Sequence, residues 1–165
     1  MAGVQAWAGD VNRSGGISLQ RGGPRRPVAV VHHDDGSEPD RVRRVARQLI
    51  TQDRVDVLLG PYSSVLSLAA AEVAEEYERL LWNQGGAADS IHQQGYRWVV
   101  GTLTPASEYL AGLLPLVRQG DPEAKTLGIV RACPGEFPRA VSQPLERTCK
   151  ALGFQLSLLR EYPPS

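Results

Sequence analysis

Short apolar runs alternate with segments of helical periodicity along the whole chain of 165 residues. The runs are too short for helices and are typical of strands buried on both faces. They lie at residues 28–31, 55–59, 80–82, 98–100, 126–130 and 154–159. Helices are predicted at 4–12, 39–50, 64–77, 105–120 and 138–152, with one helical turn at Asp89. Thr104 is the expected cap of the fourth helix, and Pro144 is expected to kink the last one or delay its start. This alternation predicts an α/β fold with a doubly wound parallel sheet and right-handed crossovers.

The composition excludes several function classes. The net charge is 0, so the chain lacks the basic excess of a protein that binds nucleic acid by neutralising phosphates. No apolar run approaches the roughly 18 residues that a membrane-spanning helix needs. The N-terminus shows no basic start followed by an apolar core, so no signal peptide is predicted in this chain.

Candidate catalytic, metal and cofactor motifs are absent from the sequence. His32 and His33 are adjacent on a predicted strand end, so their side chains would point to opposite faces and not converge on a metal. The pair Gly85 and Gly86 is too short for a phosphate or dinucleotide loop, and no nucleophile elbow is present. We predict no metal, no cofactor and no enzyme activity. Cys133 and Cys149 lack metal-site spacing, and the sequence leaves open whether they pair or remain free thiols.

One strand–turn–helix stretch is the best candidate for a binding site. The apolar run 55–59 ends at Gly60 and Pro61, and Ser63 and Ser64 then open a helix. A helix start leaves backbone N–H groups unpaired and favours negative charge, so it can hold an anionic group. The simpler interpretation is that a serine here only caps the helix.

Four loops follow predicted strands, at residues 32–37, 60–64, 83–89 and 101–105. In open parallel sheets, ligands bind beyond the carboxyl ends of the strands. The four loops should therefore meet at one edge of the sheet. The glycine-rich loop at 83–87 should let the backbone approach another group closely.

Five motifs in consistent order and spacing carry a resemblance to a known family. They are Asn-Arg-Ser-Gly-Gly-Ile at 12–17, Asp-Asp-Gly-Ser-Glu-Pro at 34–39, Leu-Gly-Pro-Tyr-Ser-Ser at 59–64, Asn-Gln-Gly-Gly-Ala at 83–87 and Gly-Thr-Leu-Thr-Pro-Ala-Ser at 101–107. The sequence resembles type I periplasmic binding proteins, in particular the leucine/isoleucine/valine-binding group that serves ABC transporters. The resemblance extends over nearly the whole chain.

The resemblance implies ligand-binding residues between two α/β lobes. They are Ser63, Ser64, Gly85, Gly86, Ala87 and Phe137. Ser64 and the glycine-rich loop would bind the carboxylate and the amino group of the ligand, with Ser63 as the neighbouring cap. Some members have a threonine hydroxyl where this chain has Ala87, which removes one polar contact. Phe137 would be an aromatic residue facing the cleft from the second lobe.

The resemblance also implies how the chain is divided. Residues 1–121 would form lobe one without its first strand, and residues 122–165 would begin lobe two. We therefore interpret the sequence as a fragment. The missing strand would lie between the strands at 28–31 and 55–59 and would leave buried edges open. We expect this chain alone not to bind leucine or valine with micromolar affinity. Trp7, Trp82 and Trp98 are expected to pack in the core or at lobe edges rather than on ligand.

The implied function is non-catalytic binding of an amino acid or a related small amide or carboxylate ligand. The protein would be the solute-binding component of an ABC transporter, located in the periplasm or at the extracellular face of the membrane, with a membrane permease as partner. The alternative is a sensory module of the same fold in a signalling or regulatory protein. The sequence alone does not identify the ligand.

Overall fold

The computed structural model describes residues 2–163, and the chain divides into two compact units, Met1–Asp34 and Asp35–Ser165. The first unit contains helix α1 (Ala2–Arg13) and the short antiparallel strands β1 (Ile17–Ser18) and β2 (Arg25–Arg26). The Asn12 side chain donates to the Val28 carbonyl at 2.8 Å and accepts from the Val28 amide at 2.6 Å. These two bonds tie the end of α1 to the segment that follows β2.

The predicted strand at 28–31 is wrong. The structure has no strand there, and Val30 and Val31 are 37% and 44% exposed. An apolar run becomes a strand only when a neighbouring strand accepts its backbone hydrogen bonds. Val28 instead bonds to the side chain of Asn12, so the loop at 32–37 does not follow a strand.

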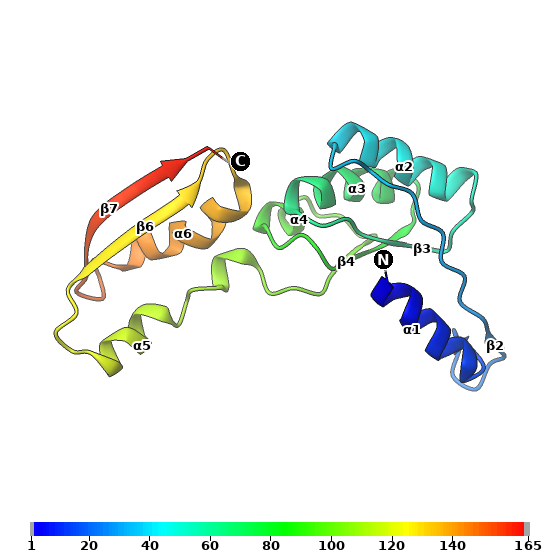
Figure 1. Ribbon diagram of the computed structural model, residues 1–165, viewed down its shortest axis with the longest axis horizontal. Helices are drawn as coiled ribbons and strands as arrows, with labels where there is room; N and C mark the ends of the chain where they lie inside the picture. The colour runs from blue at the N-terminus through cyan, green and yellow to red at the C-terminus, as the bar shows by residue number, and fades with distance from the viewer. Residues whose placement is uncertain (1, 164–165) are drawn as a thin grey trace. The chain divides into compact units, whose positions relative to one another are not determined.

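The second unit contains a three-stranded parallel sheet (Figure 1). Its order is β3 (Val57–Leu59), β4 (Leu80–Asn83) and β5 (Val99–Gly101). Helices α2 (Pro39–Thr51) and α3 (Ser64–Glu76) lie side by side over one face of this sheet (Figure 1). Leu58, Leu81 and Val73 pack in the core between these layers. Helix α4 (Asp89–Gln93) follows β4.

The opposite face of this sheet carries exposed apolar side chains, which we call the open sheet face. Val57 and Leu59 are each 49% exposed, Trp82 is 46% exposed and Val100 is 41% exposed. The expectation that these strands are buried on both faces is therefore wrong for β3, β4 and β5. Of the two alternatives for the tryptophans, packing in the core is wrong for Trp7, which is 51% exposed, and for Trp82, which lies on the open sheet face; a position at a lobe edge stays a prediction.

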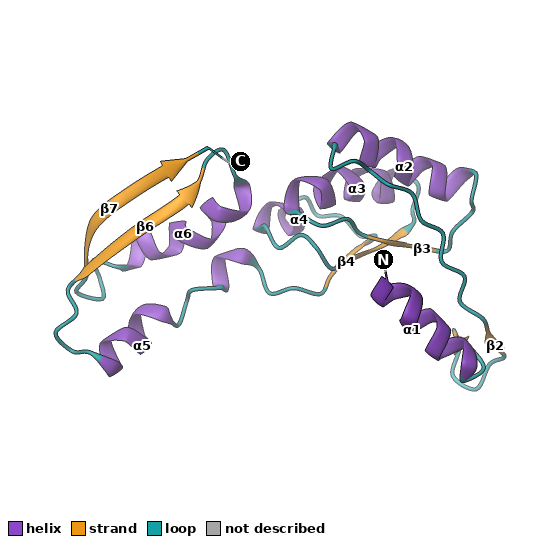
Figure 2. Cartoon of the chain, viewed as in Figure 1, coloured by secondary structure: helices purple, strands orange, loops and turns teal. Residues whose placement is uncertain are grey.

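A second strand–helix–strand arrangement follows, drawn in yellow to red in Figure 1 and visible as the long strand pair in Figure 2. Strands β6 (Thr126–Ala132) and β7 (Gln155–Tyr162) are parallel and are connected by α6 (Glu136–Thr148). Their apolar cluster consists of Leu114, Ile129, Leu145, Cys149 and Phe154. The parallel pairing in the β3–β4–β5 sheet and in the β6–β7 sheet confirms the predicted α/β fold.

The predicted helix at 105–120 is divided into two. A 3₁₀ turn, η1 (Ala106–Glu108), is followed by α5 (Leu113–Gly120). Pro115 explains the division: it fits the first turn of a helix that begins at Leu113, whereas inside a continuous helix its ring would clash with the preceding turn. Thr104 is not the cap, because Pro105 occupies that position without a side-chain cap bond. Helix α6 begins at Glu136 and runs through Pro144, so this proline did not delay its start.

Candidate functional site

Three loops at the carboxyl ends of β3, β4 and β5 are hydrogen-bonded to one another. The Ser63 amide donates to the Gly85 carbonyl at 3.1 Å, which joins the first loop to the second. The Ala106 amide donates to the Ala87 carbonyl at 2.7 Å, which joins the third loop to the second. Three of the four loops predicted to meet at one sheet edge therefore do so.

Ser63 is the N-cap of α3, as the sequence predicts. Its Oγ accepts from the Leu66 amide at 3.3 Å. Its backbone has φ = +107°, in a region that side chains rarely adopt. Such a conformation costs on the order of 1–3 kcal/mol and persists only where neighbours impose it. Here the hydrogen bond from the Ser63 amide to the Gly85 carbonyl and the start of the helix hold Ser63 in place.

Ser64 is the first residue of α3 and is only 5% exposed. Its Oγ accepts from the Ala88 amide at 3.1 Å. A hydroxyl has one proton to donate, and within residues 2–163 no hydrogen bond uses the Ser64 proton. The amides of Ser64, Val65 and Ala87 also have no acceptor in the described part of the chain. Ser64 therefore stands at a helix N-terminus with several donors still available, which is suited to an anion.

The glycine-rich loop is braced rather than flexible. Asn83 is fully buried, and its side chain donates to the Gly86 carbonyl at 2.8 Å and accepts from the Gly86 amide at 2.9 Å. The close backbone approach expected for this loop is to its own chain. A Cβ on Gly85 would overlap the Pro61 carbonyl, and one on Gly86 would lie 2.6 Å from Ser67.

Three carbonyls of this loop, those of Gly85, Gly86 and Ala87, each accept one hydrogen bond within the chain. Gly85 accepts from Ser63, Gly86 accepts from Asn83, and Ala87 accepts from Ala106. A carbonyl oxygen has two lone pairs, so each retains capacity for one more donor. The structure thus brings five of the six predicted site residues together: Ser63, Ser64, Gly85, Gly86 and Ala87.

Phe137, the sixth predicted residue, has a different contact. Its ring packs against Tyr109 in an edge-to-face arrangement, with centroids 5.6 Å apart and planes at 79°. The two side chains are 38% and 43% exposed. This pair connects the first turn of α6 to the segment just after η1.

Sequence reasoning missed the residues that hold the loops together. Asn83 is the brace of the glycine-rich loop, and Asp89 accepts from both the amide and the hydroxyl of Ser107, at 3.1 and 2.5 Å. An asparagine at a strand end before two glycines is a signal for Asn83, since Asn side chains commonly bond the backbone of a following turn. Nothing in the sequence indicates the partner of Asp89, because the two residues are 18 positions apart.

A second polar cluster lies between β6, α6 and β7. The Arg131 side chain is 11% exposed and bonds to Glu146 at 2.5 Å and to Glu161 at 2.7 Å. Two hydrogen bonds lower the pKa of Glu161. The bond from Arg131 has the larger effect and the bond from Cys133 the smaller one. This cluster is an ion-pair network that joins three elements.

The structure also bears on cysteine pairing, on metal binding and on membrane-spanning helices. Cys133 and Cys149 are free thiols, and Cys149 is buried in the second apolar cluster. Residues 2–163 contain no group of three or more His, Cys, Asp or Glu side chains that could hold a metal ion. Among the helices described, none has the length and apolar character to cross a membrane.

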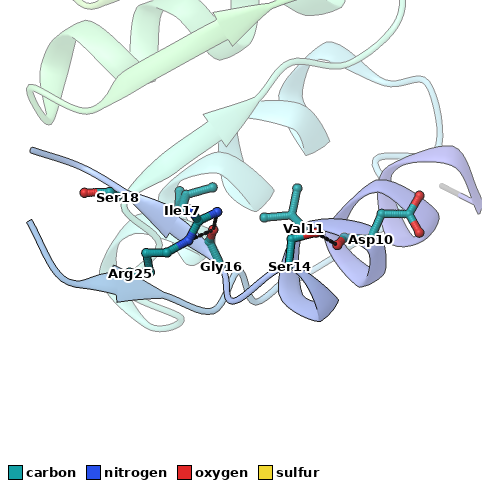
Figure 3. A pocket seen from close by; sticks show the side chains of 7 residues that line it. All are labelled: Asp10, Val11, Ser14, Gly16, Ile17, Ser18 and Arg25. Carbon is teal, nitrogen blue, oxygen red and sulfur yellow. Dashed lines mark hydrogen bonds between the residues drawn. The ribbon is translucent and has the colours of Figure 1, made fainter. Parts of the chain in front are cut away.

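The first unit contains an open hollow of 460 Å³ (Figure 3). Several of its polar groups already have partners within the chain. Arg25 donates from Nε and Nη2 to the Gly16 carbonyl at 3.1 and 2.7 Å, and the Ser14 hydroxyl donates to the Asp10 carbonyl at 3.1 Å. Asp10 also forms an ion pair with Arg13. The hollow contains none of the predicted site residues.

Comparison with known proteins defines the class to which this fold and these loops belong. The chain matches the family described as periplasmic binding protein over residues 1–165, and it belongs to that family. The family is non-catalytic, which confirms the prediction that the chain is not an enzyme.

Relatives in this family include the Leu/Ile/Val-binding protein homolog 8 of Brucella abortus. The two are 25% identical over 170 residues, which cover 98% of this chain and 40% of the relative. The chain thus spans about 40% of the length of this relative. A substrate-binding protein of Desulfitobacterium hafniense in complex with Leu has a similar fold, with a TM-score of 0.78, 16% identity, and coverage of 99% of this chain and 46% of that one. A solute binding protein of Rhodopseudomonas palustris in complex with 3,4-dihydroxy benzoic acid gives a TM-score of 0.77 at 18% identity, covering 93% and 40%.

Proposed function

We propose that this chain provides the carboxylate-binding part of a solute-binding protein whose ligand is an amino acid or a related small carboxylate. The observation that carries the proposal is the unused donors at the start of α3. The Ser64 hydroxyl is buried and oriented by the Ala88 amide, so its proton is directed away from that bond. The amides of Ser64 and Val65 lie at the positive end of the helix dipole.

The ligands of similar structures support a carboxylate at this position. Two of these structures, named above, contain leucine and 3,4-dihydroxy benzoic acid, and a branched-chain amino acid transporter substrate binding protein from Streptococcus pneumoniae contains isoleucine. The three ligands differ in size and side chain, and a carboxylate is the group that they share. A helix N-terminus with a serine hydroxyl recognises that group independently of the remainder of the ligand.

The remaining site residues have complementary roles in this proposal. The second lone pairs of the Gly85, Gly86 and Ala87 carbonyls would accept from an ammonium group. Phe137, held by Tyr109, would provide an apolar surface from the second lobe. Residues 1–121 would belong to one lobe and 122–165 to the other. Two separate apolar clusters support a division into two lobes, and the second cluster also contains Leu114 of α5. In the transporter, the protein would act in the periplasm or outside the membrane and deliver its solute to a permease.

The test is titration of the isotope-labelled chain with L-leucine, followed through its backbone amide resonances. Leucine should shift the Ser64 and Val65 amides with a dissociation constant in the millimolar range, where the binding free energy is about −4 kcal/mol. Leucinol lacks the carboxylate and should leave both amides unshifted. Ser64→Ala should weaken leucine binding about tenfold, since a hydrogen bond to a charged group contributes about 1.5–3 kcal/mol.

Ser90→Ala is the matched control, because the Ser90 hydroxyl is buried nearby and has no hydrogen-bond partner among the described residues. It should bind leucine as the unchanged chain does. Equal shifts with leucine and leucinol, or the absence of any shift at Ser64, would contradict the proposed carboxylate site.

A further inference from the structure

Asp89 and Ser107 form a two-point contact between the second and third loops. The Ser107 amide donates to Asp89 Oδ2 at 3.1 Å, and the Ser107 hydroxyl donates to Asp89 Oδ1 at 2.5 Å. Both carboxylate oxygens are thus occupied by one residue. Hydrogen bonds to an ionised acceptor are shorter and about twice as strong as neutral ones. We call this contact the Asp89–Ser107 clasp.

The clasp lies next to a peptide unit that is fixed at both ends. The carbonyl of Ala87 accepts from the Ala106 amide at 2.7 Å, and the amide of Ala88 donates to Ser64 Oγ at 3.1 Å. These two groups belong to one planar peptide unit, so a rotation that breaks one bond also misaligns the other. Ala106 immediately precedes Ser107, and Ala88 immediately precedes Asp89.

Packing around this peptide leaves little freedom for a compensating shift. Ala88 and Ala106 are fully buried and Ala87 is 3% exposed. Helix α4, which begins at Asp89, has only five residues, too few to be stable without tertiary contacts. Tertiary contacts must therefore hold α4 in place, and the two bonds between Asp89 and Ser107 are among them, together with the buried side chain of Ile91.

We propose that the Asp89–Ser107 clasp is a positioning device for the candidate site: it holds the Ala87–Ala88 peptide so that the Ala88 amide orients the Ser64 hydroxyl toward the ligand carboxylate. In this proposal Asp89 and Ser107 act through the Ala88 amide and not through a contact with the ligand. The effect on ligand affinity rests on the proposed function above, whereas the effect on the Ala88 amide does not.

The first measurement is amide hydrogen exchange of the full chain without ligand. In Asp89→Ala, which loses both clasp bonds, protection of the Ala88 and Ala106 amides should fall about tenfold. Ser107→Ala loses one bond and should show a smaller fall at the same two amides. Ser107→Thr keeps the hydroxyl and should match the unchanged chain, as should the control Ser90→Ala. Amides in α2, such as that of Ala46, should keep their protection in every variant.

The second measurement is the leucine titration described above. Leucine affinity should fall about tenfold in Asp89→Ala, less in Ser107→Ala, and not in Ser107→Thr. If the unchanged chain does not bind leucine, the proposed function is wrong. The hydrogen-exchange data then test by themselves whether the clasp holds the Ala88 amide in position. The clasp is overturned if Asp89→Ala and Ser107→Ala leave Ala88 protection unchanged. It is equally overturned if protection falls uniformly, α2 included, because that result indicates general destabilisation.

Discussion

Gly86 lies where the glycine-rich loop crosses α3, and this position has no room for a side chain. A Cβ there would be 2.6 Å from Ser67 Cβ and 2.8 Å from Ile91 Cδ1, both in fully buried residues. The constraint comes from packing within the chain, and it keeps the loop close enough for the Ser63 amide to reach Gly85.

Gly86→Ala should therefore lower the free energy of unfolding by about 1–3 kcal/mol, the usual cost of forcing an extra methyl group into a packed region. Chemical denaturation monitored by circular dichroism measures the change. Gly120→Ala is the control, because a Cβ at the last residue of α5 meets nothing within 4 Å. It should leave stability unchanged or raise it by up to about 1 kcal/mol. Equal destabilisation by both substitutions would contradict the packing explanation.

The ion-pair network of Arg131 connects β6 to α6 and to β7. Arg131 extends from β6 to Glu146 on α6 and to Glu161 on β7, and its side chain is largely covered. The same contact keeps the pKa of Glu161 below its ordinary value of 4.5. A carboxylate with a lowered pKa stabilises the folded state above its unfolded pKa, and this contribution is lost as the pH falls through the folded value.

Unfolding of the unit that contains β6 and β7 should thus become easier as the pH falls below about 4.5, the ordinary value for Glu161. Arg131→Met removes the largest cause of the lowered pKa of Glu161 and should flatten this part of the stability profile. Denaturant midpoints measured between about pH 6 and pH 3 test it. A variant whose midpoints follow the same slope as the unchanged chain would show that other carboxylates dominate the acid response.

Helices and strands can be predicted from the sequence where the local pattern of apolar and breaker residues determines them. The five parallel strands were found because apolar runs such as 80–82 are flanked by clear breakers. The strand at 28–31 failed because its pattern is equally apolar but its neighbour is the side chain of Asn12 rather than another strand. The helix at 105–120 failed because Pro115 decides where the helix begins, a constraint that outweighs the periodicity on either side.

At the scale of the whole molecule, the open sheet face is a contiguous apolar surface formed by three strands. Apolar residues at alternate positions of three adjacent strands leave Leu59, Trp82 and Val100 partly exposed. Scattered exposed apolar residues are common, whereas contiguous ones attract other apolar surfaces.

Trp82→Thr should reduce binding of the fluorescent dye ANS, because it removes the largest side chain of this face. Leu19→Thr is the control, since Leu19 is 76% exposed but lies outside the open sheet face. Dye fluorescence at equal protein concentration gives the comparison. The surface assignment would be wrong if both substitutions reduced the fluorescence equally.

The candidate site was predictable in its positions but not in its construction. A serine after a strand and a Gly-Gly pair after the next strand located Ser64, Gly85 and Gly86 at one edge, because parallel strands end together. The hydrogen bonds from Ala88 and Ala106 could not be predicted, since they depend on how three loops distant in sequence are folded against one another. The aromatic partner of Phe137 was missed for the same reason.

The hydrogen bonds between Asn83 and Gly86 constrain the sequence of the glycine-rich loop through folding. This constraint is independent of any constraint from the solute. Because the glycine-rich loop is shaped by its own strand end and by α3, its sequence is constrained by folding whatever the solute is. Under the proposed function, a change of solute would therefore not require a change in these loops. If the proposed carboxylate site is correct, proteins with chemically different carboxylate ligands could share this half of the site and differ in the residues that face the remainder of the solute.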